Sequence, residues 1–185
     1  MNVFITGCST GIGLAAAEHF TAKGYKVIAT ARNPKSSEGL QSLDQSNDSA
    51  MVLALDVTDQ ASVDTTIKKV TDEAGAIDVL INNAGGAMII KPPEEISPEE
   101  WRAGIALNLD SVFFCSQAAA KSMAEHRGGR IVNISSVAGI KASPAFVHYG
   151  AAKAGVINLT KSLALLWGKH NININCIAPG LTATE

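Results

Sequence analysis

Tyr149 and Lys153 are the two side chains whose types and spacing most clearly suggest chemistry. They stand four residues apart in a segment with a helical pattern, so they share one helix face about one turn apart. An isolated phenol titrates near pH ~10 and is a poor base at neutrality. A neighbouring ammonium stabilises the phenolate, so the pair predicts a group that gives or takes a proton. The alternative is an ordinary pair on the surface of a helix.

A glycine-rich turn near the N-terminus has the pattern of a phosphate-binding site. The segment 6–13 reads TGCSTGIG, directly after a strand-like segment and before a helical pattern that runs to Gly24. Glycines at such a turn let the backbone approach a pyrophosphate, and the helix N-terminus offers free N–H groups and a partial positive charge. Glycines also serve tight turns that bind nothing. The residues expected to contact a dinucleotide are Gly7, Ser9, Thr10, Gly11, Ile12 and Gly13.

The same turn contains Gly7-Cys8-Ser9-Thr10-Gly11, which matches the G-x-S-x-G nucleophile elbow of α/β-hydrolases. A hydrolase needs an earlier strand and loop to supply part of its oxyanion hole, and the six residues before Gly7 are too few to build them. Gly13 fits close packing between helix and strand better than hydrolysis. We therefore reject the hydrolase interpretation.

The end of the second strand indicates which dinucleotide is bound. In dinucleotide sites an acidic residue about 20 positions beyond the glycines binds the ribose 2′-hydroxyl, but here that place holds Ala31 and Arg32. A small residue removes the repulsion of a 2′-phosphate, and a guanidinium donates charge-assisted hydrogen bonds to it. The sequence thus predicts a preference for NADP(H) over NAD(H) of about ten- to hundredfold, the alternative being a surface arginine. Asp56, followed by Val57, is expected either at the adenine or as the cap of the next helix.

Short β-branched segments alternate with helical patterns along the chain. This alternation predicts a doubly wound parallel α/β sheet, a Rossmann fold with helices on both faces, with strands at 2–6, 25–30, 51–55, 79–82, 131–134 and 172–177. Ser97 followed by Pro98 and Glu100 has the pattern of a capping box, so a helix should begin near Ser97. The polar stretch 34–49 favours a poor helix with a mobile surface loop.

Composition narrows the class of protein. The 185 residues fit a single domain, 1–185, and a net charge of −2 without a basic block favours neither nucleic acid nor an anionic membrane as a partner. No apolar stretch approaches the roughly 20 residues of a spanning helix, and no signal-peptide pattern is present, so we expect a cytoplasmic protein. Cys8, Cys115 and Cys176 lack the spacing of a zinc site or a disulfide framework, so we expect free thiols and no metal.

Taken in order, the motifs of this sequence resemble those of the short-chain dehydrogenase/reductases of the common single-domain type. The resemblance covers essentially the whole chain. It is carried by the glycine turn 6–13, Asn82-Asn83-Ala84-Gly85, Asn108, Ile134-Ser135-Ser136, Tyr149-x-x-x-Lys153 and Pro179-Gly180. Each motif alone could arise by chance, but together, in this order and at these spacings, they leave little room for another family.

The resemblance implies an NADP-preferring oxidoreductase that moves a hydride between nicotinamide C4 and a carbonyl or secondary alcohol. Tyr149 would exchange the proton, while Lys153 would support it and hold the nicotinamide ribose. Ser136, thirteen residues before Tyr149, would bind the substrate oxygen, whereas Ser135 is off this spacing by one residue and on the opposite strand face. Asn108 would position a water that relays protons to Lys153. The further residues assigned to the cofactor are Asn83, Ala84, Gly85, Pro179, Gly180, Thr182 and Thr184.

Members of that family continue for some tens of residues beyond Pro179-Gly180, whereas this chain ends at Glu185. We therefore expect the C-terminal part of the family fold to be absent and the substrate pocket to be incomplete. The alternative function is an NADP(H)-binding sensor or subunit without significant turnover. Association into a homodimer or homotetramer through the helices that contain Asn108 and Tyr149 is also expected by resemblance.

Overall fold

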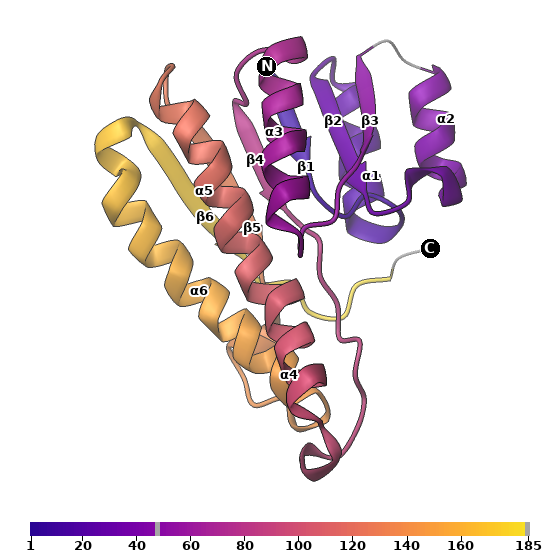
Figure 1. Cartoon of the computed structure of the whole chain (residues 1–185), viewed down its shortest axis with the longest axis vertical. Helices are drawn as coiled ribbons and strands as arrows, with labels where there is room; N and C mark the ends of the chain where they lie inside the picture. The colour runs from indigo at the N-terminus through magenta and orange to yellow at the C-terminus, as the bar shows by residue number, and fades with distance from the viewer. Residues whose placement is uncertain (47–48, 184–185) are drawn as a thin grey trace.

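One parallel sheet of six strands forms the centre of the structure, a computed structural model that describes residues 1–46 and 49–183 (Figure 1). The strands are β1 (Asn2–Ile5), β2 (Lys26–Ala31), β3 (Ala50–Ala54), β4 (Val79–Asn82), β5 (Gly129–Ile134) and β6 (Ile172–Ile177). All six predicted strands are confirmed, with ends that differ by at most two residues. Their order across the sheet is β3-β2-β1-β4-β5-β6, so the winding reverses between β1 and β4. Open α/β sheets bind ligands beside such a reversal.

Helices cover both faces of this sheet, as predicted for a Rossmann fold. One face carries α1 (Gly11–Ala22) and α2 (Glu38–Ser46), and the opposite face carries α3 (Gln60–Ala74), α5 (Ser111–Ala124) and α6 (Val147–Trp167). A helix that begins as α4 (Pro98–Ile105) continues into α5 and projects beyond the sheet (Figure 1). None of the helices within the described residues has the length and apolar composition needed to cross a bilayer.

The central strand β1 is held from both sides. Val3 and Ile5 pack into the apolar cluster beneath α1 and α2, while Phe4 packs into the cluster beneath α3, α5 and α6. Successive side chains of a strand point to opposite faces, so three consecutive apolar residues are buried in two different cores. The glycine turn that follows β1 therefore starts from a fixed position.

The capping box predicted at Ser97 is confirmed. Ser97 Oγ accepts a hydrogen bond of 3.2 Å from the Glu100 N–H, and Glu100 Oε2 accepts one of 2.9 Å from the Ser97 N–H. This reciprocal pair satisfies N–H groups that have no partner within the helix. It begins α4 at Pro98, and so sets where the continuous α4–α5 rod starts.

The polar stretch 34–49 is more helical than its composition suggests. It forms a 3₁₀ turn (η1, Pro34–Ser36) and then α2, in which Leu40 and Leu43 are buried against the sheet. Two leucines three residues apart share one helix face, and their burial stabilises a helix that the polar residues around them disfavour. Residues 47–48 of this stretch lie outside the described residues, so the loop expected within 34–49 stays a prediction there.

Candidate active site

A cavity of about 480 Å³ opens at the carboxyl edge of the sheet, where segments that follow all six strands meet. The predicted site residues on its wall are Gly7, Ser9, Thr10, Gly11, Ile12, Arg32, Val57, Asn83, Ala84, Gly85, Ser136, Tyr149, Lys153, Pro179, Gly180 and Thr182. The wall also contains Ala31, Ile134 and Ser135, which belong to segments that the sequence indicated, and four residues that it did not indicate, namely Leu55, Met88, Leu107 and Leu181. The carboxyl edge of the sheet thus brings together residues that are far apart in the sequence.

The glycine turn presents backbone to this cavity at the start of α1. Gly7 has a φ of +72°, which glycine adopts without strain, and a Cβ there would lie 2.7 Å from the Ala84 Cα. Thr10, the residue before the helix, makes no side-chain hydrogen bond to the first turn, and this turn contains no acidic residue. The N–H groups at the N-terminus of α1 are therefore available to a phosphate.

Gly13 belongs to the packing beneath the turn and not to the wall of the cavity. A Cβ at Gly13 would lie 2.3 Å from the Gly7 carbonyl oxygen and 2.4 Å from Asn83 Nδ2. The backbone of α1 thus lies directly against the end of β1, which is the close approach that the sequence assigned to this glycine.

Thr6 and Asn83 bind the ends of β1 and β4 together. Thr6 Oγ1 accepts hydrogen bonds of 3.0 Å from the N–H groups of Asn83 and Ala84. Asn83 Nδ2 donates in return to the carbonyl oxygens of Thr6 at 3.0 Å and Gly7 at 2.9 Å. The glycine turn is therefore fixed by a segment about 77 residues away. This role of Thr6 was not predicted from the sequence, although its place directly before Gly7 was a signal.

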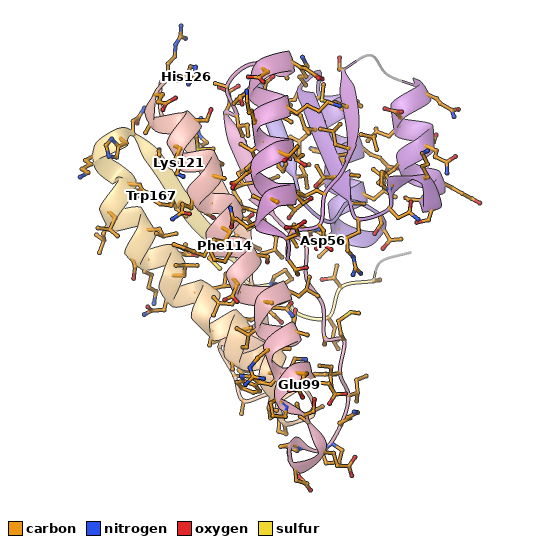
Figure 2. All side chains as sticks on the ribbon, viewed as in Figure 1. Asp56, Glu99, Phe114, Lys121, His126 and Trp167 are labelled. Atoms are coloured by element: carbon orange, nitrogen blue, oxygen red, sulfur yellow. The ribbon has the colours of Figure 1, made fainter. Side chains whose placement is uncertain are left out.

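Arg32 and Asp56 lie at the β2 and β3 end of the site. Arg32 is exposed on the cavity wall, and Asp56, labelled in Figure 2, follows β3. Asp56 Oδ1 accepts from the hydroxyl of Thr58 at 2.7 Å and from its N–H at 2.9 Å. These bonds, with a smaller effect of the Arg32 charge, hold the pKa of Asp56 below its ordinary value. The expected alternative for Asp56, a helix cap, is wrong because Asp59 caps α3.

Two adjacent serines after β5 have different partners. Ser135 is buried and its Oγ donates a hydrogen bond of 2.8 Å to the Lys153 carbonyl oxygen. Ser136 is half-buried on the cavity wall, where its Oγ accepts a bond of 3.2 Å from the Ala138 N–H. The Ser136 hydroxyl proton therefore remains able to bond a ligand, whereas that of Ser135 is used within the fold.

Tyr149 and Lys153 come together on the first turns of α6. Lys153 is only 3% exposed, its Nζ donates a 2.8 Å hydrogen bond to the Ile134 carbonyl oxygen, and Nζ lies 5.5 Å from the centroid of the Tyr149 ring. Burial lowers the pKa of Lys153 to about 8. A Cβ at Gly85 would lie 3.2 Å from Lys153 Nζ and 2.7 Å from Asn108 Oδ1, so the loop after β4 closes directly over both groups.

Asn108 lies in a π-helical turn (η3, Ala106–Asp110) between α4 and α5 and is fully buried. Its Nδ2 donates to the carbonyl oxygens of Gly104 and Gly86, both at 3.0 Å, and its Oδ1 accepts from the Gly86 N–H at 2.9 Å. These bonds fasten the loop after β4 to the helix rod, and π-turns often occur at functional sites. The local widening of the helix was not visible in the sequence.

The segment after β6 closes the far end of the wall. The Val137 N–H donates to the Pro179 carbonyl oxygen at 3.0 Å, which joins this segment to the turn that carries Ser136. Thr182 lies on the wall with an exposed side chain, and its hydroxyl donates to the Gly180 carbonyl oxygen at 3.3 Å. Thr184 lies outside the described residues.

Comparison with known proteins agrees with this architecture. The family model described as short chain dehydrogenase matches residues 1–185. The 3-oxoacyl-[acyl-carrier-protein] reductase FabG of Haemophilus influenzae is 39% identical over 184 residues, which cover 98% of this chain and 74% of the relative. Gluconate 5-dehydrogenase of Gluconobacter oxydans is 40% identical over 182 residues, which cover 98% of this chain and 71% of the relative.

Solved structures show the same fold. The structure described as ElxO with NADP bound superposes with a TM-score of 0.92 at 36% identity, and it covers 100% of this chain and 75% of that chain. Levodione reductase superposes with a TM-score of 0.91 at 34% identity, and the match covers 99% of this chain and 72% of that chain. These relatives are longer than this chain, as the resemblance implied. The chain belongs to the short-chain dehydrogenase family of NAD(P)-dependent oxidoreductases.

Proposed function

We propose that this protein is an NADP-preferring oxidoreductase that transfers a hydride between the nicotinamide and a carbonyl or secondary alcohol, with Tyr149 as the general acid and base. The observation that carries the proposal is the buried ammonium of Lys153, held 5.5 Å from the Tyr149 ring on the wall of the cavity. Within the described residues this buried cation has no carboxylate partner, which costs free energy. The buried ammonium would stabilise the phenolate of Tyr149 beside it, and this role accounts for its burial.

The residues present fit a dinucleotide. The cavity holds about 480 Å³, a volume typical of cofactor pockets, and the uncapped N-terminus of α1 and the backbone of Gly7 face it. When bound, the nicotinamide supplies or accepts the hydride at its C4 atom. Asn83, Ala84 and Gly85 would border it on the β4 side, and the segment after β6 on the other. The residues that would hold the nicotinamide end are Tyr149, Lys153, Pro179, Gly180 and Thr182.

Each member of the catalytic group has a separate task at the substrate oxygen. In reduction, Tyr149 Oη gives its proton to this oxygen, and in oxidation it takes the proton back. Ser136 Oγ donates a hydrogen bond that stabilises the charge on the oxygen as the proton moves. Lys153 stabilises the resulting phenolate. Asn108 keeps the loop after β4 against Lys153, and its proposed water would return protons to the lysine.

The preference for NADP(H) rests on the end of β2. Ala31 is buried and uncharged, and the exposed Arg32 guanidinium can reach a 2′-phosphate at the mouth of the cavity. The solved relative with NADP bound supports this assignment. Asp56 and Val57 follow the next strand, where Val57 forms part of the wall. The Asp56 carboxylate, whose Oδ1 accepts hydrogen bonds from Thr58, would accept from the adenine.

Tyr149→Phe tests the central step. The substitution removes one hydroxyl, so kcat for reduction of a carbonyl should fall by at least about 1,000-fold, because general acid catalysis is lost. The dissociation constant of NADPH, measured by fluorescence titration, should stay within about threefold. The matched control is Tyr25→Phe, which removes the same hydroxyl between α1 and β2 and should leave both values unchanged. Retention of most of the activity in Tyr149→Phe would remove this tyrosine from the proposed role.

Arg32→Ala tests the cofactor preference. Loss of charge-assisted hydrogen bonds worth about 1.5–3 kcal/mol should weaken NADPH by about ten- to hundredfold. The affinity for NADH should change by less than about twofold, because NADH has no 2′-phosphate. Equal losses for the two cofactors would contradict a direct contact between Arg32 and the phosphate. Tight NADPH binding without turnover on any carbonyl would instead favour a sensor or subunit module.

Association through the helix rod and α6 remains part of the proposal. Ala151 and Ala154 are exposed on α6, as are Leu165 and Leu166 nearer its end, so this helix offers small and apolar side chains to a partner. Gly150 and Gly155, in contrast, pack within the chain. A two-fold dimer or a tetramer built from it follows from such self-complementary helices, and sedimentation velocity measures the mass directly.

A further inference from the structure

Exposed apolar side chains gather on the three segments that border the catalytic group. Of the twelve large hydrophobic residues that the described part of the chain exposes, five belong to these segments: Met88 and Ile90 after β4, Val137 and Ile140 after β5, and Leu181 after β6. Single exposed apolar residues are ordinary, but a set that converges on one site marks a place where a ligand is bound.

This apolar rim, defined by those five residues, meets the catalytic end of the cavity through Met88, Val137 and Leu181, and Ile90 and Ile140 follow on the same segments. Met88 and Leu181 lie on the same wall as Ser136 and Tyr149. The Val137 turn is joined to the segment after β6 by its hydrogen bond to Pro179. The rim therefore begins where the substrate oxygen must lie and extends outward from it.

The polar groups at this end of the cavity are few. Among the described residues that form the wall there is no carboxylate, and the only cations are Lys153, which is bonded to a backbone carbonyl, and Arg32, which follows β2 on the other side of β1. The side-chain amide of Asn83 is used by backbone carbonyls. Beyond the rim, Lys91 is paired with Glu100.

We infer that the substrate is a ketone, or the matching secondary alcohol, that carries an apolar alkyl or acyl chain, and not a polyhydroxylated compound; this inference rests on the function proposed above. The hydroxyls of Ser136 and Tyr149, both on the cavity wall, would donate the hydrogen bonds that the reacting oxygen needs. Each further hydroxyl of a sugar or polyol would need its own hydrogen-bond partner, since unpaired polar groups are costly to bury. The rim offers methyl, methylene and thioether groups instead. Met88 also adapts well to chains of different shape.

The test is the kcat/KM of the full protein, with NADPH, for 2-butanone, 2-hexanone and 2-octanone, and for D-fructose as a polyhydroxylated ketone. Complete burial of a methylene is worth about 0.8 kcal/mol, or about fourfold. On a rim that covers about half of the chain we expect about twofold per methylene, and so about 15-fold from 2-butanone to 2-octanone. D-fructose should be a poorer substrate than 2-butanone.

Two variants at one position separate the apolar rim from a general effect on the enzyme. Met88→Ser should lower the ratio of kcat/KM for 2-octanone to that for 2-butanone by about threefold, whereas Met88→Leu, which keeps an apolar side chain, should restore it. Val137→Thr, with nearly the same shape, provides a second variant with the same expected direction. Thermal melts of the three proteins verify that each is folded.

The outcomes distinguish this inference from the function on which it rests. If the protein reduces ketones but kcat/KM is flat or falls with chain length, or if D-fructose is preferred, the apolar class is overturned while the oxidoreductase remains. An unchanged ratio in both Met88→Ser and Val137→Thr overturns the rim as the binding surface. If no carbonyl is reduced although NADPH binds, the proposed function itself fails.

Discussion

The two halves of the cavity are built in different ways. On the cofactor side, the glycine turn and the end of β4 meet backbone to backbone, and Thr6 and Asn83 tie them together with four hydrogen bonds. On the substrate side, exposed side chains such as Met88 and Leu181 form the wall, on segments that lie between regular elements. A cavity wall made of backbone cannot change shape without disturbing the fold. The exposed side chains on the other wall can be substituted one at a time.

This difference explains how one fold supports many substrates. Relatives of similar identity are named as a 3-oxoacyl-[acyl-carrier-protein] reductase, a gluconate 5-dehydrogenase and a D-threitol dehydrogenase. All three names are those of oxidoreductases, but the substrates in the names differ. This is in keeping with the rule that sites and not folds define substrates.

Gly13→Ala should have the largest effect, because it disturbs the backbone half. The new methyl group would lie 2.3 Å from the Gly7 carbonyl oxygen and 2.4 Å from Asn83 Nδ2, and both atoms are held by other contacts. We expect the free energy of unfolding to fall by about 2–4 kcal/mol in urea titrations. NADPH should bind at least about 100-fold more weakly, because Gly7 must move out of the cavity wall.

Gly168→Ala is the control for that variant, since a Cβ at Gly168 meets no atom within 4 Å. It should leave both the stability and the NADPH affinity nearly unchanged. If Gly13→Ala binds NADPH within about threefold of the wild type, the backbone half is more compliant than the comparison requires.

Most of the regular elements were predictable because their signals are local. Short β-branched segments predicted the strands, and the Ser97–Glu100 pair predicted the start of α4. Of the candidate site, the glycine turn and the Tyr149–Lys153 pair could also be predicted, since each lies within one turn of the chain. The choice of Ser136 over Ser135 depended on spacing and stays a prediction, which is supported by the different partners of the two hydroxyls.

What the sequence did not show depends on partners far away along the chain. Thr6 is an ordinary threonine until the fold places the end of β4 beside it. The burial of Leu40 and Leu43 requires the sheet, and without it α2 is a nine-residue, mostly polar segment, too short to form a stable helix alone. The cap of α3 shows the same limit at short range, because the sequence analysis considered Asp56 as the cap, whereas in the structure Asp59 caps the helix.

Lys153 lies where the two halves meet, and its burial can be measured through the pH dependence of stability. Its folded pKa of about 8 lies below the ordinary 10.5, so between these values the unfolded state binds more protons than the folded state. Stability therefore rises with pH, as the cost of the buried charge at pH 7 is lifted. Between pH 7 and pH 10, the free energy of unfolding of the wild type should rise by about 2.5 kcal/mol more than that of Lys153→Met.

Urea titrations of both proteins at the two pH values give this difference, and the contributions of groups that do not interact with Lys153 cancel. A wild-type gain below about 0.5 kcal/mol would mean that the ammonium stays hydrated in the folded protein. Lys153 would then belong to the exposed half of the site, and its stabilisation of the phenolate would be correspondingly weak.

Gly86→Ala should have the smallest effect and locates the boundary between the halves. A Cβ at Gly85 would collide with Asn108 Oδ1 at 2.7 Å, but one residue later, at Gly86, the nearest atom is Met88 Sδ at 4.0 Å. Both backbone hydrogen bonds of Gly86 to Asn108 survive the added methyl group. Because alanine has less freedom in the unfolded chain, unfolding should cost the same or up to about 1 kcal/mol more. Comparable damage from Gly85→Ala and Gly86→Ala, in urea titrations and in kcat/KM, would extend the rigid half toward Met88 and narrow the part of the site that can adapt to new substrates.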